Sequence, residues 1–399
     1  MSGSSGRTSP RMVGAAILGT LSGSLPVFLL GGLSVQVAEE IGISSVQLGL
    51  LFAVFFAGSA VTSVTLGYLI ERLGARRSML LASLLGAISL GGIGIATSTV
   101  AMMAVFLAFG SLSNAVVQPA ANLLIARGVP VQRRGLIFGF KQAAVPLGSM
   151  LAGAAVPTIG LTVGWRVAFV VATALPVLAA LLTPSAEGTA RPAGAGSSGK
   201  DARPESPVRA LALLAIASGT ATAAATTLGT FLVVAAVTQG VAPGHAGILL
   251  SIGGASSVAT RVLFGWRADR VVTGHLRVVR GMMMTGVVGF VMLAISPAVA
   301  SPLPLLALGT FLAFAGGWGW NGLLTHAVVE RNRSAPAAAT GITQTGLYAG
   351  GMLGPLLFGL VSDRFGFPAG WWMGVGLLVI AIISARAGER GMDGVATAR

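Results

Sequence analysis

A lysine inside a long apolar stretch is the residue whose chemistry is most informative in this sequence. Lys141 falls in the apolar segment 135–160, about 9 Å from its start if the segment is an α-helix with a rise of about 1.5 Å per residue. A lysine at the centre of a membrane helix costs roughly 2.5–3.5 kcal/mol, so intramembrane cations are functional candidates. Two interpretations stay open: Lys141 lines a cavity for an anionic substrate, or its ammonium group extends to the membrane interface.

Polar and aromatic residues occur at similar depths in other apolar segments. Asn114, Gln118 and Asn122 are spaced at i, i+4 and i+8, which places them on one helical face, with Gln118 near the level of Lys141. Amides, aromatic rings and one cation suit a small polar anion. The predicted substrate-contacting residues are Lys141, Gln142, Asn114, Gln118, Trp318, Trp320, Asn321, Gln344 and Tyr348. The alternative for each amide is a hydrogen bond between helices.

The composition indicates that these residues are carried by membrane-spanning helices. Of 399 residues, 54% are hydrophobic and only 9% are charged, whereas soluble domains carry roughly 25% charged residues. The net charge of +14 does not indicate nucleic-acid binding, because the basic residues lie in short clusters between apolar runs. The chain has no cysteine, and its three histidines (His245, His275 and His326) are too widely spaced to match a metal-ligand pattern.

Charges and clusters of Pro, Gly and Ser divide the chain into twelve stretches, each long enough to cross a bilayer. These stretches are 12–37, 46–70, 78–98, 101–126, 135–160, 164–183, 208–238, 246–266, 278–297, 303–328, 337–361 and 368–386. Segment 184–207 is rich in Pro, Gly and Ser and is expected to be a flexible linker. We therefore expect an all-α membrane protein with six-helix bundles in 1–183 and 208–399.

The distribution of basic residues predicts the orientation of these helices. Most of the 25 basic residues fall in segments that lie on one side if both termini are cytoplasmic, whereas the other side holds only Arg166 and Arg364. Cytoplasmic loops of membrane proteins carry an excess of Lys and Arg. The sequence thus predicts a multi-pass plasma-membrane protein, in contact with lipid, with a cytoplasmic linker and both termini inside.

A charged turn recurs at equivalent places in the two halves. The first copy is GYLIERLGARR (Gly67–Arg77), after the second stretch, and a shorter copy is GWRADR (Gly265–Arg270), after the eighth. GFKQAAVPLGSML (Gly139–Leu151) also aligns with GITQTGLYAGGML (Gly341–Leu353) at a constant offset of 202. These echoes indicate an internal duplication, with the two halves related as parallel repeats.

The charged turn resembles the signature loop of the major facilitator superfamily, usually written G-x-L-x-D-R-x-G-R-R. Glu71 stands in place of the aspartate and Ala75 in place of a basic residue. The twelve-span layout, the central linker and GWRVAF (Gly164–Phe169) extend the resemblance over the whole chain. It implies two pseudo-symmetric six-helix bundles that rock about a central site.

The resemblance also implies a gate at the cytoplasmic side. Glu71 would face the start of the eleventh helix near Pro336–Ala339, and Asp269 would face the start of the fifth near Gly135, where a carboxylate interacts favourably with a helix N-terminus. The predicted gating residues are Gly67, Glu71, Arg72, Arg76, Arg127, Arg261, Gly265, Asp269 and Arg270. The alternative is a charge cluster that sets only membrane topology.

These patterns predict a secondary transporter of a small organic anion. The alternative is a proton-coupled efflux pump, which the sequence disfavours because no Asp or Glu lies well inside a predicted span. A non-transporting receptor on the same fold is a third possibility. No enzyme activity, cofactor, metal or nucleic-acid partner is expected, and the chain is expected to be a monomer.

Labelling of the loops in intact membranes tests the twelve-span arrangement. The Arg72–Arg77 turn and the Arg133–Arg134 turn should both react from the same side, because an even number of helices separates them. Reaction from opposite sides would refute the span count.

Overall fold

The computed structural model describes residues 10–129, 131–184, 205–268, 274–332 and 335–396, and excludes the side chains of 62–72, 126–128, 131–136, 268, 336–338 and 394–396. The described residues form helices and connecting turns, with no strand among them. The α-helices of residues 10–182 are α1 (Pro10–Gly32), α2 (Ser34–Ile41), α3 (Ser45–Ala96), α4 (Val100–Gly128), α5 (Val131–Ala155), α6 (Trp165–Ala172) and α7 (Ala174–Leu182). Those of residues 208–396 are α8 (Val208–Val237), α9 (Pro243–Ala268), α10 (His275–Ile295), α11 (Pro302–Gly317), α12 (Asn321–Glu330), α13 (Pro336–Phe365) and α14 (Phe367–Ala396).

The long helix α3 contains two of the expected membrane spans. Its backbone leaves the helical conformation at Gly74, where φ is 79°, a value that glycine adopts without the steric cost of a Cβ. The segment Leu73–Ala96 is a complete apolar span, while Ser45–Val61 pairs with α2 across a bend of 114°. Among the described residues, eleven helices are therefore long and apolar enough to cross a membrane, or twelve if the bent pair counts as one span.

Three predicted stretches are interrupted helices rather than continuous ones. The first predicted stretch, 12–37, is divided at Leu33 into α1 and α2, and α2 continues to Ile41. The sixth breaks at Thr173, between α6 and α7, and the tenth breaks at 318–320, between α11 and α12. Apolar periodicity and length do not reveal such breaks, because the broken segments remain apolar throughout.

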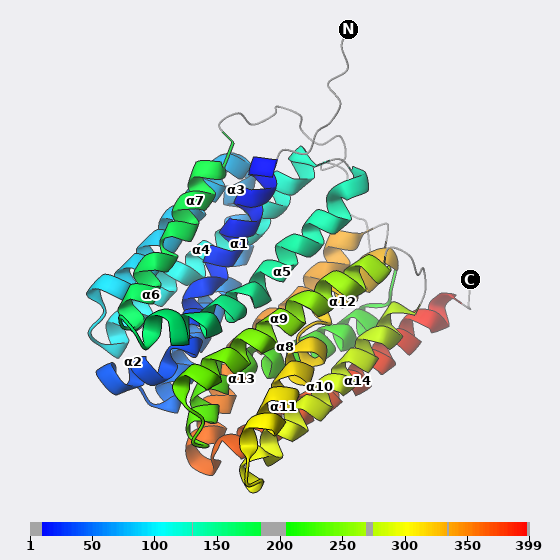
Figure 1. The fold of residues 1–399 in the computed structure, drawn as a ribbon. Helices are drawn as coiled ribbons and strands as arrows, with labels where there is room; N and C mark the ends of the chain where they lie inside the picture. The colour runs from blue at the N-terminus through cyan, green and yellow to red at the C-terminus, as the bar shows by residue number, and fades with distance from the viewer. Residues whose placement is uncertain (1–9, 130, 185–204, 269–273, 333–334, 397–399) are drawn as a thin grey trace.

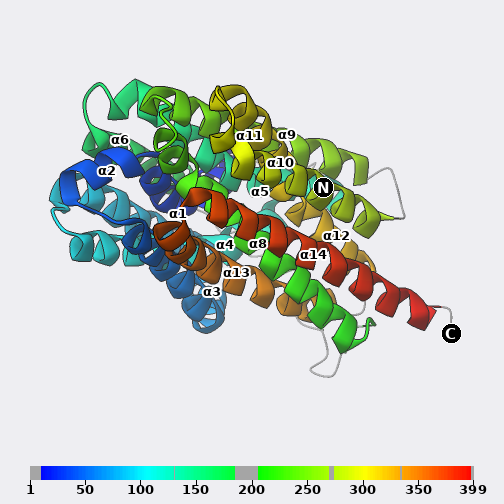
Figure 2. The same cartoon turned by 90° about the horizontal axis from the view of Figure 1, so that it is seen from below.

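The two halves of the chain contact each other through equivalent helix pairs. Helix α5 packs against α9, and α13 packs against the first part of α3. The offset of 202 that relates α5 to α13 also carries 45–61 onto 247–263, which lies inside α9. Helices α1 and α8 lie side by side between these pairs (Figures 1 and 2). This arrangement is that of two duplicated helical units facing each other.

We call the face at which α1 and α8 begin the terminal face, and the other the distal face. The end of the last helix, α14, lies at the same end of the molecule as the start of α1 (Figure 1). Toward the distal face, backbones of the two halves come very close: a Cβ at Gly31 of α1 would clash with the carbonyl oxygen of Gly229 of α8. Ser251 of α9 donates a hydrogen bond to the carbonyl of Met150 of α5 at 2.9 Å. The two halves are therefore tightly packed near the distal face.

The outward-facing side chains of the helices are largely apolar. Leu84, Ile95, Leu181 and Ile383 expose between 59% and 76% of their surface in the isolated chain. Many other large apolar side chains of the helices are exposed as well, and apolar surface in this amount marks a membrane or protein contact. With the apolar spans, they define an all-α, multi-pass membrane protein.

Substitution of Gly31 tests the close approach of α1 and α8. Gly31→Ala should lower the free energy of unfolding by about 1–3 kcal/mol, because the added methyl group meets backbone that cannot rotate away. Gly376→Ala in α14 is the matched control: its Cβ would meet no atom within 4 Å, so it should be neutral or gain up to about 1 kcal/mol in helix propensity. Thermal unfolding in detergent, followed by the fluorescence of the six tryptophans, measures both. A Gly31→Ala protein as stable as the control would contradict the packing.

Candidate functional site

The Lys141 ammonium group is buried between α4 and α5. Its side chain is only 2% exposed, and Nζ donates hydrogen bonds to Gln118 Oε1 at 2.5 Å and to Asn122 Oδ1 at 3.0 Å. The backbone carbonyl of Gln118 lies 3.5 Å from Nζ. The helical spacing of the two amides places both oxygens beside the ammonium group. In this conformation Lys141 does not extend to the membrane interface.

The described groups that solvate Lys141 are neutral. Among the described side chains, none of the ion pairs involves Lys141 or Arg261. Hydrogen bonds from a charged donor are stronger than neutral ones, which offsets part of the cost of removing the cation from water. No described carboxylate neutralises the positive charge itself. The site is therefore suited to an additional negatively charged ligand.

Arg261 of α9 connects three elements of the two halves. Its Nη1 donates to the carbonyl oxygen of Gln142 on α5 at 2.8 Å, and its Nη2 donates to the carbonyl oxygen of Trp318 at 3.0 Å. Trp318 lies at the break after α11, where helix-terminal carbonyls need partners. The guanidinium group is buried, and Nε has no hydrogen-bond partner within the described part of the chain. Because Lys141 and Gln142 are adjacent, one turn of α5 carries the first cation and accepts a hydrogen bond from the second.

The aromatic residues at the break have different surroundings. The Trp318 ring contacts Phe28 of α1 and Phe314 of α11, each with ring centroids 5.4 Å apart, so it lies between the halves. Trp320 is 1% exposed, and its indole Nε1 donates to the carbonyl of Gly317 at 2.8 Å. Trp320 is therefore packed inside its own helix break, whereas Trp318 lies next to the Arg261 site.

The other predicted lining residues have three kinds of surroundings. Asn114 donates from Nδ2 to the Ser59 hydroxyl of α3 at 3.2 Å, which is a bond between helices. Gln142 contributes its backbone carbonyl to Arg261. Asn321, Gln344 and Tyr348 are partly buried on α12 and α13, and their role in binding stays a prediction.

Most of the predicted gate lies outside the described residues. The side chains of Glu71, Arg72 and Arg127 are not described, nor are Asp269 and Arg270. The backbone of Gly67 is helical within α3. Arg76 follows the Gly74 break and is partly buried, and Gly265 has open space where a Cβ would project. The gating interactions of this cluster stay a prediction.

Sequence reasoning missed an ion pair near the distal face. Glu40 of α2 binds Arg166 Nη2 at 2.7 Å and accepts a hydrogen bond from Trp165 Nε1 at 2.6 Å. Arg166 also lies over the Trp165 ring, 4.5 Å from its centroid. Glu40 is 125 and 126 residues away from these partners in the sequence, so only an alignment of related sequences could have indicated the contact. It connects the ends of α2 and α6.

The comparisons with known proteins identify the class of this protein. Residues 14–297 match the model of the Major Facilitator Superfamily, which is more than half of the chain, so the chain belongs to this superfamily of membrane transporters. The structure resembles that of a mutant of the nucleoside transporter NupG, with a TM-score of 0.73 over 95% of this chain and 99% of that one. Sequence identity is 16%, so this likeness supports the fold alone.

Three curated relatives match parts or most of the chain. A cis,cis-muconate transport protein of Acinetobacter baylyi is 31% identical over 42% of this chain and 40% of its own length. A hexuronate transporter of Bacillus subtilis is 23% identical over 37% of this chain and 34% of its own length. A chloramphenicol resistance protein of Streptomyces lividans is 28% identical over 83% of both chains. The matches to the first two thus span well under half of those relatives.

Substitution of Arg261 tests the connection between α9, α5 and the helix break. Arg261→Lys should lower the free energy of unfolding by about 1.5–3 kcal/mol, because one ammonium group cannot replace a guanidinium fork that reaches two separate carbonyls. Arg267→Lys, at an exposed position of the same helix, is the control and should be near neutral. Thermal unfolding in detergent compares the two variants. Equal melting temperatures would show that the two carbonyl bonds contribute nothing.

Proposed function

We propose that this protein is a secondary active transporter of a small organic anion, with Lys141 as the main counter-charge. The observation that carries the proposal is the buried Lys141 ammonium group, which is bound by two amide side chains and by no carboxylate among the described residues. Uncompensated intramembrane cations are costly and typically mark a substrate or ion pathway. An anion would supply the missing charge.

The amides around Lys141 suit a site that is alternately empty and occupied. Gln118 and Asn122 each carry an oxygen acceptor and an NH₂ donor on one side chain. In the present conformation their oxygens accept from Lys141. When a carboxylate takes over that role, rotation of the amides presents NH₂ groups to the same anion. One set of residues can therefore stabilise both the empty and the loaded site.

The curated relatives support an anionic substrate. A hexuronate transporter, a cis,cis-muconate transport protein and a probable sulfoacetate transporter of Cupriavidus necator all match segments of this chain. Hexuronate, muconate and sulfoacetate share ionised acid groups on small polar or unsaturated carbon frames. We infer that the substrate of this protein carries at least one carboxylate or sulfonate group.

We further propose that transport proceeds by alternating access between units formed by 1–183 and 208–399, joined by 184–207. Packing of α1 on α8 and of α5 on α9 toward the distal face supports a closed distal side. With both termini and the linker in the cytoplasm, this arrangement corresponds to an inward-facing state of a monomeric plasma-membrane transporter. Movement to the outward-facing state must loosen these distal contacts and engage the predicted gate around Glu71 and Asp269.

Efflux of a neutral or apolar compound is the second candidate. The chloramphenicol resistance protein aligns over 83% of both chains, much further than the anion transporters. Drug export driven by protons usually uses a titratable carboxylate inside the membrane. The acidic residues of the described ion pairs lie in the last turn of their helices or, for Glu389, two turns before the end of α14. The role of Lys141 distinguishes the two candidates, since export of a neutral compound has no need of a buried cation.

Transport by Lys141 variants in proteoliposomes tests the proposal. Lys141→Gln and Lys141→Ala should reduce uptake of labelled galacturonate, muconate or sulfoacetate at least about tenfold, a loss of roughly 1.4 kcal/mol or more in transition-state stabilisation. Lys141→Arg should retain part of the activity, because it keeps the positive charge. Arg267→Gln, at an exposed position, is the control for non-specific charge effects.

The same preparations show which outcome contradicts the proposal. Melting temperatures measured with and without each acid separate loss of binding from loss of folding. If folded Lys141→Gln transports any of these acids as well as the wild type, Lys141 is not the counter-charge. If the wild type transports none of the acids but expels chloramphenicol, the efflux candidate replaces the anion transporter.

A further inference from the structure

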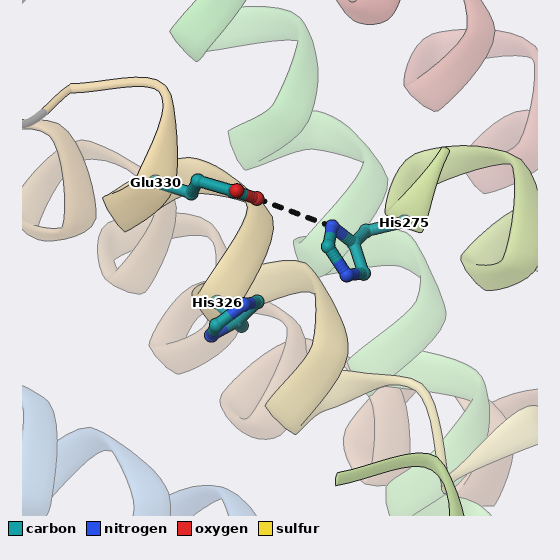
Figure 3. Close-up of side chains that lie close together, drawn as sticks. All are labelled: His275, His326 and Glu330. Carbon is teal, nitrogen blue, oxygen red and sulfur yellow. Dashed lines mark ion pairs between the residues drawn. The ribbon is translucent and has the colours of Figure 1, made fainter. Parts of the chain in front are cut away.

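Two histidines that are far apart in the sequence lie together at the terminal face. His275 is the first residue of α10, and His326 lies near the end of α12; their ring centroids are 5.1 Å apart. Glu330, one turn after His326, places Oε2 3.2 Å from His275 Nδ1 (Figure 3). One potential ligand atom of each residue lies within 4.8 Å of the others. The wide sequence spacing of the histidines concealed this cluster.

Two imidazoles and one carboxylate form a donor set for a transition-metal ion. Zinc sites with three protein ligands use such combinations, with a fourth position for water or another ligand. His326 and Glu330 are at i and i+4 on one helix, so both side chains project from the same face. Ligand atoms around a tetrahedral ion with bonds of about 2.0–2.1 Å are roughly 3.3–3.5 Å apart. The three ligand atoms lie within 4.8 Å of one another, so ion binding would draw them together by about 1.5 Å or less.

The environment of His275 is a second, independent indication that this side chain binds a ligand. This side chain is 7% exposed, and its Nε2 has no hydrogen-bond partner in the described part of the chain. A histidine binds an ion through one ring nitrogen, and His275 offers either Nε2, which has no partner among the described residues, or Nδ1, which faces Glu330. Glu330 is partly exposed and His326 is exposed. The cluster thus has a buried, fixed ligand on α10 and two ligands on α12 that an ion can reach from solvent.

We propose that His275, His326 and Glu330 form a binding site for a divalent transition-metal ion, with zinc as the best fit. Mixed imidazole and carboxylate ligands favour zinc over magnesium or calcium, which prefer oxygen ligands alone. The ion would connect α12 to α10. Because α12 begins just after the break whose Trp318 carbonyl binds Arg261, a bound ion would restrain the half-helix next to the candidate substrate site. Metal binding itself does not depend on the proposed function.

Equilibrium dialysis of the full-length, tag-free protein against zinc, with elemental analysis, tests the site. The wild type should retain about one zinc ion per chain, because the cluster offers one set of ligands. His326→Ala and Glu330→Gln should weaken binding at least about tenfold, since each removes one of three ligands. His245→Ala is the matched control, because His245 is an exposed histidine at the start of α9, outside the cluster.

His275→Ala removes a buried side chain and can unfold the protein, so it is not needed for the test. A second measurement on the other variants confirms the ligands instead. Replacement of zinc by cobalt should give the visible absorption of tetrahedral coordination in the wild type and in His245→Ala, and not in His326→Ala. An excess of magnesium should leave that absorption unchanged. Zinc retention by His326→Ala equal to that of the wild type, or displacement of the ion by magnesium, would overturn the assignment.

Discussion

A positive charge in a low-dielectric interior must be solvated by the protein, and this requirement organises the centre of the molecule. Lys141 meets it with two amide oxygens of α4, one turn apart. The amides solvate the ammonium group but do not neutralise it. The local structure therefore stabilises a buried cation while preserving its attraction for an anion. The proposed substrate site requires that combination, whereas in a structural ion pair both charges are already satisfied.

Arg261 is a second buried cation that the protein must solvate, and its partners lie on both sides of the interface between the halves. Its guanidinium group reaches a carbonyl of α5 and a carbonyl at the break between α11 and α12. A continuous helix would have used the Trp318 carbonyl within its own ladder; the break makes it available to a side chain from α9. Helix α5 thus carries one cation and binds another through adjacent residues. In the proposed alternating-access cycle, changes at this site would be coupled to α5, α9 and the break between α11 and α12.

The fold could be predicted from the sequence because its driving forces are local and repeated. Apolar stretches of bilayer length, charged turns at equivalent places and an offset of 202 predicted the membrane helices and their duplication, and the pairing of α5 with α9 and of α13 with α3 is consistent with that duplication. The breaks at Thr173 and at 318–320 could not be predicted. The broken segments stay apolar, and their freed backbone groups are satisfied by contacts that only packing provides, such as that of Arg261.

The sequence by itself determined which residues could do chemistry: an intramembrane lysine, amides on one face of a helix and a second cation near a glycine. It determined this because burying polar groups in lipid is costly and a helix has a fixed period. Tertiary structure decided which of these groups meet. It placed Gln118 and Asn122 on Lys141, directed Asn114 to Ser59 instead, and brought His275 to His326 from different helices. Such contacts depend on how whole helices pack, and residue spacing within one helix does not encode them.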